Sequence, residues 1–200
     1  MGTRGLTCVV LDNEFKIAQY GQWDHYIDGQ GKTIYNFLKK MKIRDFKNKV
    51  RNLKQLTSEE VNDRWKECGA DDSGFVDLEI SDIFKSKYEH LDRDCGAKVL
   101  NLVATGKATD IYLSTDFASD SLFCEWAYVI DLDKKKFEIY QGFQNEPHTG
   151  QRFSNFPVEK PTNPGSSIYY PVALIKSYDI KKLPEFETII KDCAENNEEE

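Results

Sequence analysis

The segment Tyr20–Gly31 holds the residue types in this chain that are most suited to binding or chemistry. Within twelve residues it carries an indole, two phenols, two carboxylates, an imidazole and two amides. Its three glycines let the backbone approach a ligand closely, and binding residues concentrate on such loops between rigid elements. We therefore predict a binding site whose members are Arg4, Tyr20, Gln22, Trp23, Asp24, Tyr26 and Gln30.

A structural interpretation of the same segment stays open. Trp23 and Tyr26 would then plug one end of the core, while Asp24 and Asp28 would cap turns. His25 has no Ser or Cys near it in sequence, so we expect an ordinary surface residue there rather than a catalytic base.

Other motifs for catalysis or metal binding are missing from the sequence. It lacks a phosphate-binding G-x-x-x-x-G-K-[ST] and a G-x-S-x-G nucleophile elbow, and Asp71–Gly74 lacks the spacing of a calcium loop. Asp131 and Asp133 are expected to be charges at the end of a hairpin. The five scattered cysteines form no close metal-binding pair, so we expect reduced, buried thiols, no metal and no cofactor.

Charge is distributed unevenly along the chain. From Lys32 to Lys54 there are nine basic residues and one acidic residue, a net charge of +8, and the whole chain carries −7, which leaves −15 for the remainder. A basic helical face could meet phosphate or an acidic protein, although most such runs are the solvated side of an amphipathic helix. The candidate contacts on this face are Lys39, Lys40 and Lys47.

Two hairpins and a final strand are predicted. Gly5–Leu11 and Phe15–Tyr20 flank the turn pair Asp12-Asn13, and Leu122–Asp131 and Phe137–Gln141 flank a lysine-rich turn. Ile111–Thr115 is a short strand candidate, and Ile168–Ile175, interrupted by Pro171, is expected at an edge or bulge. Residues 146–167 are expected to be an irregular connection.

Residues 32–106 are expected to be mostly helical. The apolar stripe through Ile34 and Phe37 restarts out of phase at Ile43, which predicts a break near Lys42. Thr57 and Glu60 form a capping box, and two later helices are expected to begin at caps provided by Ser81 and Asp94, the second ending at Gly106. A last helix is expected at 185–194.

The order of strands, helices, strands and a helix predicts an α+β fold with antiparallel sheets. We expect one domain over residues 1–194, an acidic tail over 195–200, and order nearly throughout. No apolar run approaches the roughly 20 residues of a membrane-spanning helix, and no secretion signal opens the chain. The expected location is the cytoplasm, without a membrane partner.

The opening Met-Gly-Thr-Arg-Gly and the loop starting at Tyr20 resemble a family of uncharacterised proteins seen in bacteriophages and bacterial genomes. That family combines an M-G-T-R-G start with a Y-G-Q-W-D-G-Y-P-x-G-Q-G-like loop, and the resemblance extends through Trp65–Ala70 and Trp126–Asp133. This chain departs from the pattern at His25 and Ile27. The resemblance implies a host cell cytoplasm if the protein is phage-encoded, and it implies no particular activity.

A fainter resemblance is to the N-terminal nucleophile hydrolases, which stack two antiparallel sheets between helices. It rests on the opening hairpin and on Val129–Leu132, and it implies an αββα sandwich. Those enzymes need Cys, Ser or Thr at the mature N-terminus. Removal of Met1 would leave Gly2, and Thr3, Thr7 or Cys8 would serve only after self-cleavage.

Three functions therefore remain as hypotheses. The first is a non-enzymatic binding protein, a phage or prophage accessory factor that acts on a host protein or a small signalling ligand. The second is an amidohydrolase of the N-terminal nucleophile type, or a degenerate derivative of one. The third is a nucleic-acid-binding module that uses residues 32–54, although the acidic body disfavours that partner. The sequence leaves the oligomeric state open.

Overall fold

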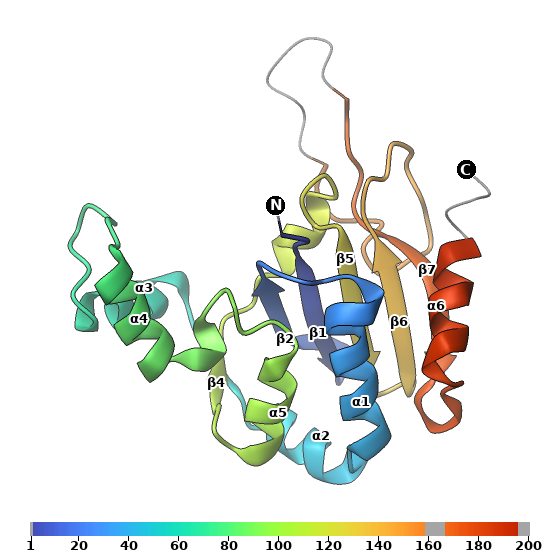
Figure 1. Cartoon of the computed structure of the whole chain (residues 1–200), viewed down its shortest axis with the longest axis horizontal. Coiled ribbons are helices and arrows are strands. Elements are labelled where there is room, and N and C mark those ends of the chain that lie inside the picture. Colours follow the sequence, from blue (N-terminus) through green and yellow to red (C-terminus); the bar gives the residue numbers. More distant parts are fainter. Residues whose placement is uncertain (1, 159–166, 196–200) are drawn as a thin grey trace.

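The structure is a computed structural model that describes residues 2–158 and 167–195, and it has an α+β architecture (Figure 1). Its centre is a five-stranded sheet in the order β2-β1-β5-β6-β7. The strands are β1 (Gly5–Leu11), β2 (Glu14–Gly21), β5 (Trp126–Asp131), β6 (Lys136–Gln141) and β7 (Ala173–Asp179).

The sheet is mixed, which corrects the expectation of wholly antiparallel sheets. β1 pairs in parallel with β5, while the other neighbours pair antiparallel. The long helical segment between the two hairpins returns the chain so that β5 enters beside β1 in the same direction. The other sheet among the described residues joins β3 (Lys54–Gln55) to β4 (Asp110–Ile111), so these residues contain no second large layer of the kind an αββα sandwich requires.

Both predicted hairpins are present, although the strand predicted over Leu122–Asp131 begins only at Trp126, and β7 lies at the sheet edge as expected. Asp12 and Asn13 have φ angles of 57° and 61°, the left-handed values that a tight hairpin turn needs. β7 begins only after Pro171 and Val172, later than predicted, because proline cannot donate to a strand ladder. The predicted strand at Ile111 is only two residues long, and Thr115–Ser119 forms a short 3₁₀ helix, η3.

Four helices cover one face of the sheet, which we call the helix face. They are α1 (Lys32–Lys40), α2 (Ile43–Arg51), α5 (Lys98–Thr105) and α6 (Phe186–Glu195). The predicted break near Lys42 is confirmed, since Met41 and Lys42 have extended backbone angles. Val9 and Ile130 from the strands meet Phe37 and Leu100 from the helices in the larger core.

The opposite face, which we call the loop face, is covered by η3 and by the connection after β6. Leu6, Cys8 and Val129 point to this side and pack with Phe153, which is fully buried. Strand residues alternate between the two faces, so β1 contributes to both cores. This explains why every residue of β1 is buried. Residues 159–166 of the predicted irregular connection, and the tail beyond 195, lie outside the described residues.

Helices α3 (Ser58–Glu67) and α4 (Leu78–Lys87) project away from the sheet, and we call residues 58–87 the arm (Figure 1). Trp65 of α3 and Phe84 of α4 stack with their rings nearly parallel. Two hydrogen bonds from the Arg64 guanidinium to Asp110, at 3.0 and 2.8 Å, join the arm to the rest of the molecule.

The caps of these helices confirm one prediction and correct two. Thr57 and Glu60 form the predicted capping box. α4 begins at Leu78 with Asp77 as its cap, three residues before the predicted start at Ser81. α5 begins at Lys98 without a side-chain cap, and Asp94 is occupied elsewhere. None of the helices in the described part of the chain combines the length and the apolar character needed to cross a membrane.

Candidate functional site

The backbone of the loop Tyr20–Gly31 is fixed at three places by hydrogen bonds. The backbone amide of Gln22 donates to the carbonyl of Arg93 at 2.9 Å, and the backbone amide of His25 donates to the carbonyl of Thr3 at 3.1 Å. Inside the loop, the amide of Gln30 donates to the carbonyl of Asp24 at 2.7 Å. The loop is therefore held by the opening segment on one side and by residues before α5 on the other.

Trp23 is held in place while much of its ring stays in solvent. The indole ring packs tightly on Gly2: a β-carbon added to Gly2 would lie 2.0 Å from Cε3 of Trp23. The indole Nε1 donates to Asp94 Oδ1 at 2.9 Å, and Lys85 of the arm pairs with the same carboxylate at 2.7 Å. Trp23 nevertheless remains 46% exposed and Tyr26 51% exposed. Neither ring is enclosed in the core.

His25 is fully buried, which corrects the expectation of a surface residue. Its imidazole lies against Gly5 and Gly21, which face each other across the β1–β2 ladder. Neither ring nitrogen makes a well-formed hydrogen bond to a described residue. Burial lowers the pKa of His25 to about 4, against a smaller opposing effect of the Trp23 backbone. The ring is neutral at neutral pH and fills space beneath the loop.

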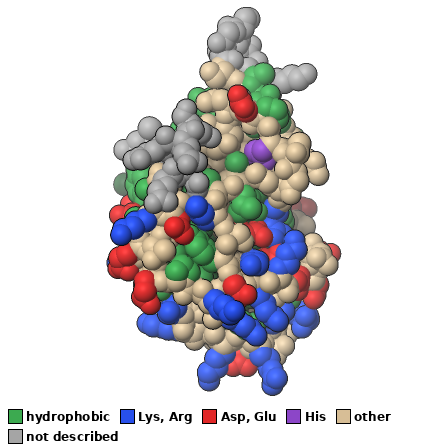
Figure 2. Space-filling model, turned by 90° about the vertical axis from the view of Figure 1, so that its right-hand side faces the viewer, with side chains coloured by type: hydrophobic (Ala, Val, Ile, Leu, Met, Phe, Trp, Pro, Cys, Tyr) green, Lys and Arg blue, Asp and Glu red, His purple; other side chains and the backbone are tan. Residues whose placement is uncertain are grey.

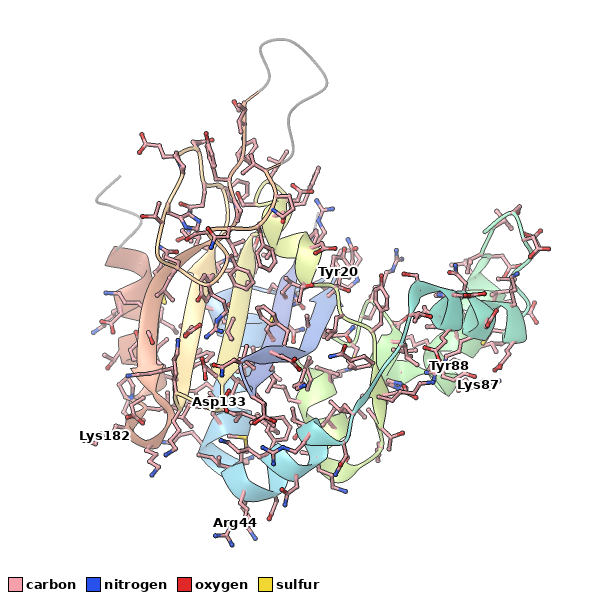
Figure 3. All side chains as sticks on the ribbon, turned by 180° about the vertical axis from the view of Figure 1, so that it is seen from behind. Tyr20, Arg44, Lys87, Tyr88, Asp133 and Lys182 are labelled. Atoms are coloured by element: carbon pink, nitrogen blue, oxygen red, sulfur yellow. The ribbon has the colours of Figure 1, made fainter. Side chains whose placement is uncertain are left out.

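Arg4, Tyr20 and Gln22 come together where β2 ends, at the position labelled for Tyr20 in Figure 3. The Tyr20 hydroxyl donates to Gln22 Oε1 at 2.5 Å, and its ring meets Phe117 edge to face. Burial raises the pKa of Tyr20, and the positive charge of Arg4 partly opposes that rise. These three predicted site residues thus form one partly exposed cluster.

Two other predicted site residues, Gln30 and Asp24, differ in how far their side chains face solvent. The Gln30 side chain packs against Gly96, and its Oε1 accepts a hydrogen bond from the amide of Ala97 at 3.0 Å. It therefore ties the loop to the start of α5 instead of facing solvent. Asp24 is exposed and has a φ of 58°, so it turns the chain between Trp23 and His25.

Sequence reasoning missed the aromatic neighbours of Arg4. The Arg4 guanidinium lies 4.3 Å from the ring centre of Phe123, which is itself exposed. Phe143 is also exposed. Its amide donates to the carbonyl of Ser121 at 2.8 Å, which joins it to the turn that contains Phe123. No periodicity marks these residues, which follow η3 and β6. We use the name loop surface for the predicted site residues other than Gln30, together with Phe123. Its members are Arg4, Tyr20, Gln22, Trp23, Asp24, Tyr26 and Phe123.

The residues considered as nucleophiles are inaccessible. Thr3, Thr7 and Cys8 are all buried, and burial raises the pKa of Cys8 to about 12. A thiol in that state is protonated at neutral pH, whereas the thiolate is the nucleophile. All five cysteines are buried and free, and within the described ranges no three His, Cys, Asp or Glu side chains lie close enough to hold a metal ion.

The loop face contains a buried ionic cluster that the sequence did not reveal. Arg152 donates to both carboxylate oxygens of Glu138 at 2.9 Å and to Asp131 Oδ2 at 2.6 Å. Tyr140 donates to Glu138 as well, at 2.8 Å. Asp131 is therefore a buried ion-pair partner, while Asp133 keeps the predicted place at the hairpin end and lies 3.9 Å from Lys47. The cluster attaches the connection after β6 to the sheet.

Helix α2 and the last turn of α1, which carry most of the basic residues of these two helices, lie at the end of the molecule that is lowest in Figure 1, and Figure 2 shows lysine and arginine side chains gathered at that end. Lys39 and Lys40 are exposed and make no ion pair with a described residue, and Arg44 points into solvent in Figure 3. Beside them, a groove of about 440 Å³ lies between α1, α2 and α5. Its lining includes Phe37, Lys40, Met41, Lys42 and Phe46.

Comparisons of the chain with protein-family models, with curated proteins and with solved structures found no match to it.

Proposed function

We propose that this is a non-enzymatic binding protein that recognises a protein partner through the loop surface, with Trp23 as the anchor. The observation that carries this proposal is the state of Trp23, which is fixed by Gly2 and Asp94 and is still 46% exposed. Tryptophan and arginine are enriched among the residues that dominate interface energies. An anchor that is already ordered loses little conformational entropy on binding.

The composition of the loop surface supports a protein partner over a small signalling ligand. Protein interfaces are enriched in aromatic residues and arginine and have polar rims. Here Trp23, Tyr26 and Phe123 provide exposed rings, and Gln22 and Asp24 provide hydrogen-bonding groups beside them. The resemblance of this loop to phage-borne proteins supports a host protein as the partner.

Affinity capture with four immobilised proteins tests the proposal. The wild type is compared with Trp23→Ala, with Gln22→Ala and with the matched control Tyr112→Ala, an exposed aromatic residue beside the arm. We expect a protein retained by the wild type and the control, lost with Trp23→Ala and reduced with Gln22→Ala. A set of captured proteins that is the same for Trp23→Ala and wild type would contradict the proposal.

A further inference from the structure

The arm exposes apolar side chains that nothing else in the described chain covers. Leu78, at the start of α4, is 85% exposed and Phe75 is 68% exposed, and Val76 and Ile83 are partly exposed as well. The core of the arm is already closed by the stack of Trp65 on Phe84. These exposed side chains therefore do not hold the arm together.

The arm is also acidic. Residues 58–87 contain nine acidic and four basic residues, a net charge of −5. All four basic side chains have acidic partners: Arg64 pairs with Asp110, Lys66 with Asp72, Lys85 with Asp94 and Lys87 with Glu67. Glu79 and Asp82, on the same helix as Leu78 and Ile83, make no ion pair with a described residue. The exposed apolar side chains of α4 are thus accompanied by carboxylates that make no direct ion pair with a described residue, in an arm of net charge −5.

The groove between α1, α2 and α5 combines apolar and basic side chains, which complement the apolar and acidic side chains of the arm. Phe37 and Phe46, which are almost fully buried, form its apolar floor, and Met41 adds a partly exposed thioether. Lys40 and Lys42 line it without ion-pair partners among the described residues, within a segment of net charge +8 whose one acidic residue, Asp45, also lines the groove. Its volume of about 440 Å³ is within the range of pockets that enclose a small organic ligand, so it can receive large side chains such as leucine and phenylalanine.

We propose that the arm of one copy of this chain docks into the α1–α2 groove of a second copy, with Leu78 and Phe75 entering the groove and Glu79 and Asp82 meeting Lys40 and Lys42. The net charges of the arm and of residues 32–54 are opposite, and both the arm and the groove present apolar side chains. In Figure 1 the arm points away from α1 and α2, so it does not fill the groove of its own chain. This interface is independent of the loop surface.

The contact joins two different surfaces, so it is heterologous. After the first contact one copy keeps a free groove and the other keeps a free arm, and such assemblies close into rings or grow as open chains. Because exposed charge pairs are screened by salt, the assembly weakens as ionic strength rises. The wild type is therefore expected to show a molar mass above that of one chain, increasing with protein concentration at low salt.

Two variants that each remove one half of the contact give the sharpest test. Leu78→Asp disables the arm, and Lys40→Glu combined with Lys42→Glu disables the groove; all three positions are exposed, so folding should be preserved. Measured by sedimentation velocity, each variant alone should be monomeric. An equimolar mixture should form a complex of two chains and no larger, because one intact arm and one intact groove remain. The matched control Leu122→Asp, an exposed leucine outside both surfaces, should assemble like the wild type.

Several outcomes would overturn the proposal. A wild type that remains monomeric at low salt and high concentration contradicts it, and so does assembly by either variant alone. A mixture of the two variants that stays monomeric also contradicts it, even if each single variant has lost assembly, because the arm and the groove would then not be partners. Circular dichroism of each variant separates these outcomes from unfolding.

Discussion

The imidazole of His25 lies directly against Gly21, so that a β-carbon added to Gly21 would stand 2.0 Å from Cε1 of the ring. Gly5, the partner of Gly21 across the β1–β2 ladder, contacts the other side of the ring, where an added β-carbon would lie 2.7 Å from Cδ2. The two glycines leave a space in the sheet surface that the imidazole fills. The loop is thereby supported from below, with Trp23 two residues before the buried ring.

Gly21→Ala should destabilise the protein because its methyl group would overlap the imidazole. We expect a loss of about 1–3 kcal/mol in the free energy of unfolding, measured by urea titration. His25→Ala alone should also destabilise, by roughly 2–5 kcal/mol, through the cavity that it leaves. In the double variant the methyl group has room, so the loss should be smaller than the sum of the two. Additive losses would show that the two residues are not in contact in solution.

The buried imidazole also predicts how stability depends on pH. The pKa of His25 is about 4 in the folded protein and about 6.5 in an unfolded chain, so the unfolded state binds more protons between these values. The stability that depends on a neutral His25 is fully present above about pH 6.5. It falls as the pH drops towards 4, with a slope of at most about 1.4 kcal/mol per pH unit. His25→Leu, which cannot titrate, should lose less stability between pH 7 and pH 5. Equal losses in urea unfolding of the two proteins would contradict this assignment.

Local patterns in the sequence predicted the fold well where neighbouring residues determine the structure. Asp12-Asn13, the break near Lys42 and the Thr57–Glu60 capping box are all fixed by backbone geometry within a few residues. The parallel pairing of β1 with β5 depends on how a long segment returns, and no local pattern encodes that. His25 was misassigned for the same reason, because its burial requires two glycines that only the β1–β2 register brings together.

Arg152 is predicted to be essential for stability through its two buried partners. Burial tends to raise the pKa of Asp131, but the amide of Lys134 and the Arg152 side chain outweigh it and hold the pKa below its usual value. Arg152→Met would leave the Asp131 and Glu138 carboxylates buried without a cation, at a cost of about 3–5 kcal/mol. Thermal unfolding at neutral pH should show a large decrease for this variant. Lys191→Met, an exposed control on α6, should be nearly neutral, and comparable behaviour of the two variants would refute the role of the cluster.

The candidate site was only partly predictable from sequence. Trp23 and Tyr26 were identified by residue type, and they are exposed. Phe123 could not be identified, since its relevance comes from Arg4, which lies far away in the chain. Gln30 was selected for its amide, but that amide bonds to the start of α5. Residue type indicates what a side chain can do, whereas the packing around it determines whether it is free to do so.

Nucleic acid should bind only weakly to the basic end of the molecule. If Lys39, Lys40 and Lys47 each met a phosphate of duplex DNA, the logarithm of the affinity would fall with the logarithm of salt concentration by roughly 0.9 per contact. Lys47 already lies near Asp133, and the remainder of the chain carries −15, so we expect no sub-micromolar binding at physiological salt. Fluorescence anisotropy with labelled duplex and single strands measures this. Tight binding, with a salt slope that corresponds to three phosphate contacts, would instead assign residues 32–54 a nucleic-acid function.

The dissociation constant of the captured partner for Trp23→Ala, taken together with the melting temperature of that variant, tests the central claim most directly. An interface anchor of this kind commonly contributes about 2 kcal/mol or more, which corresponds to a weakening of at least roughly 30-fold. Because about half of the ring is in solvent and its main support is Gly2, the melting temperature should stay within a few degrees of the wild type. We predict weak binding by a folded protein. A variant that unfolds, or one that binds as tightly as the wild type, would show that Trp23 is part of the scaffold and that recognition lies elsewhere.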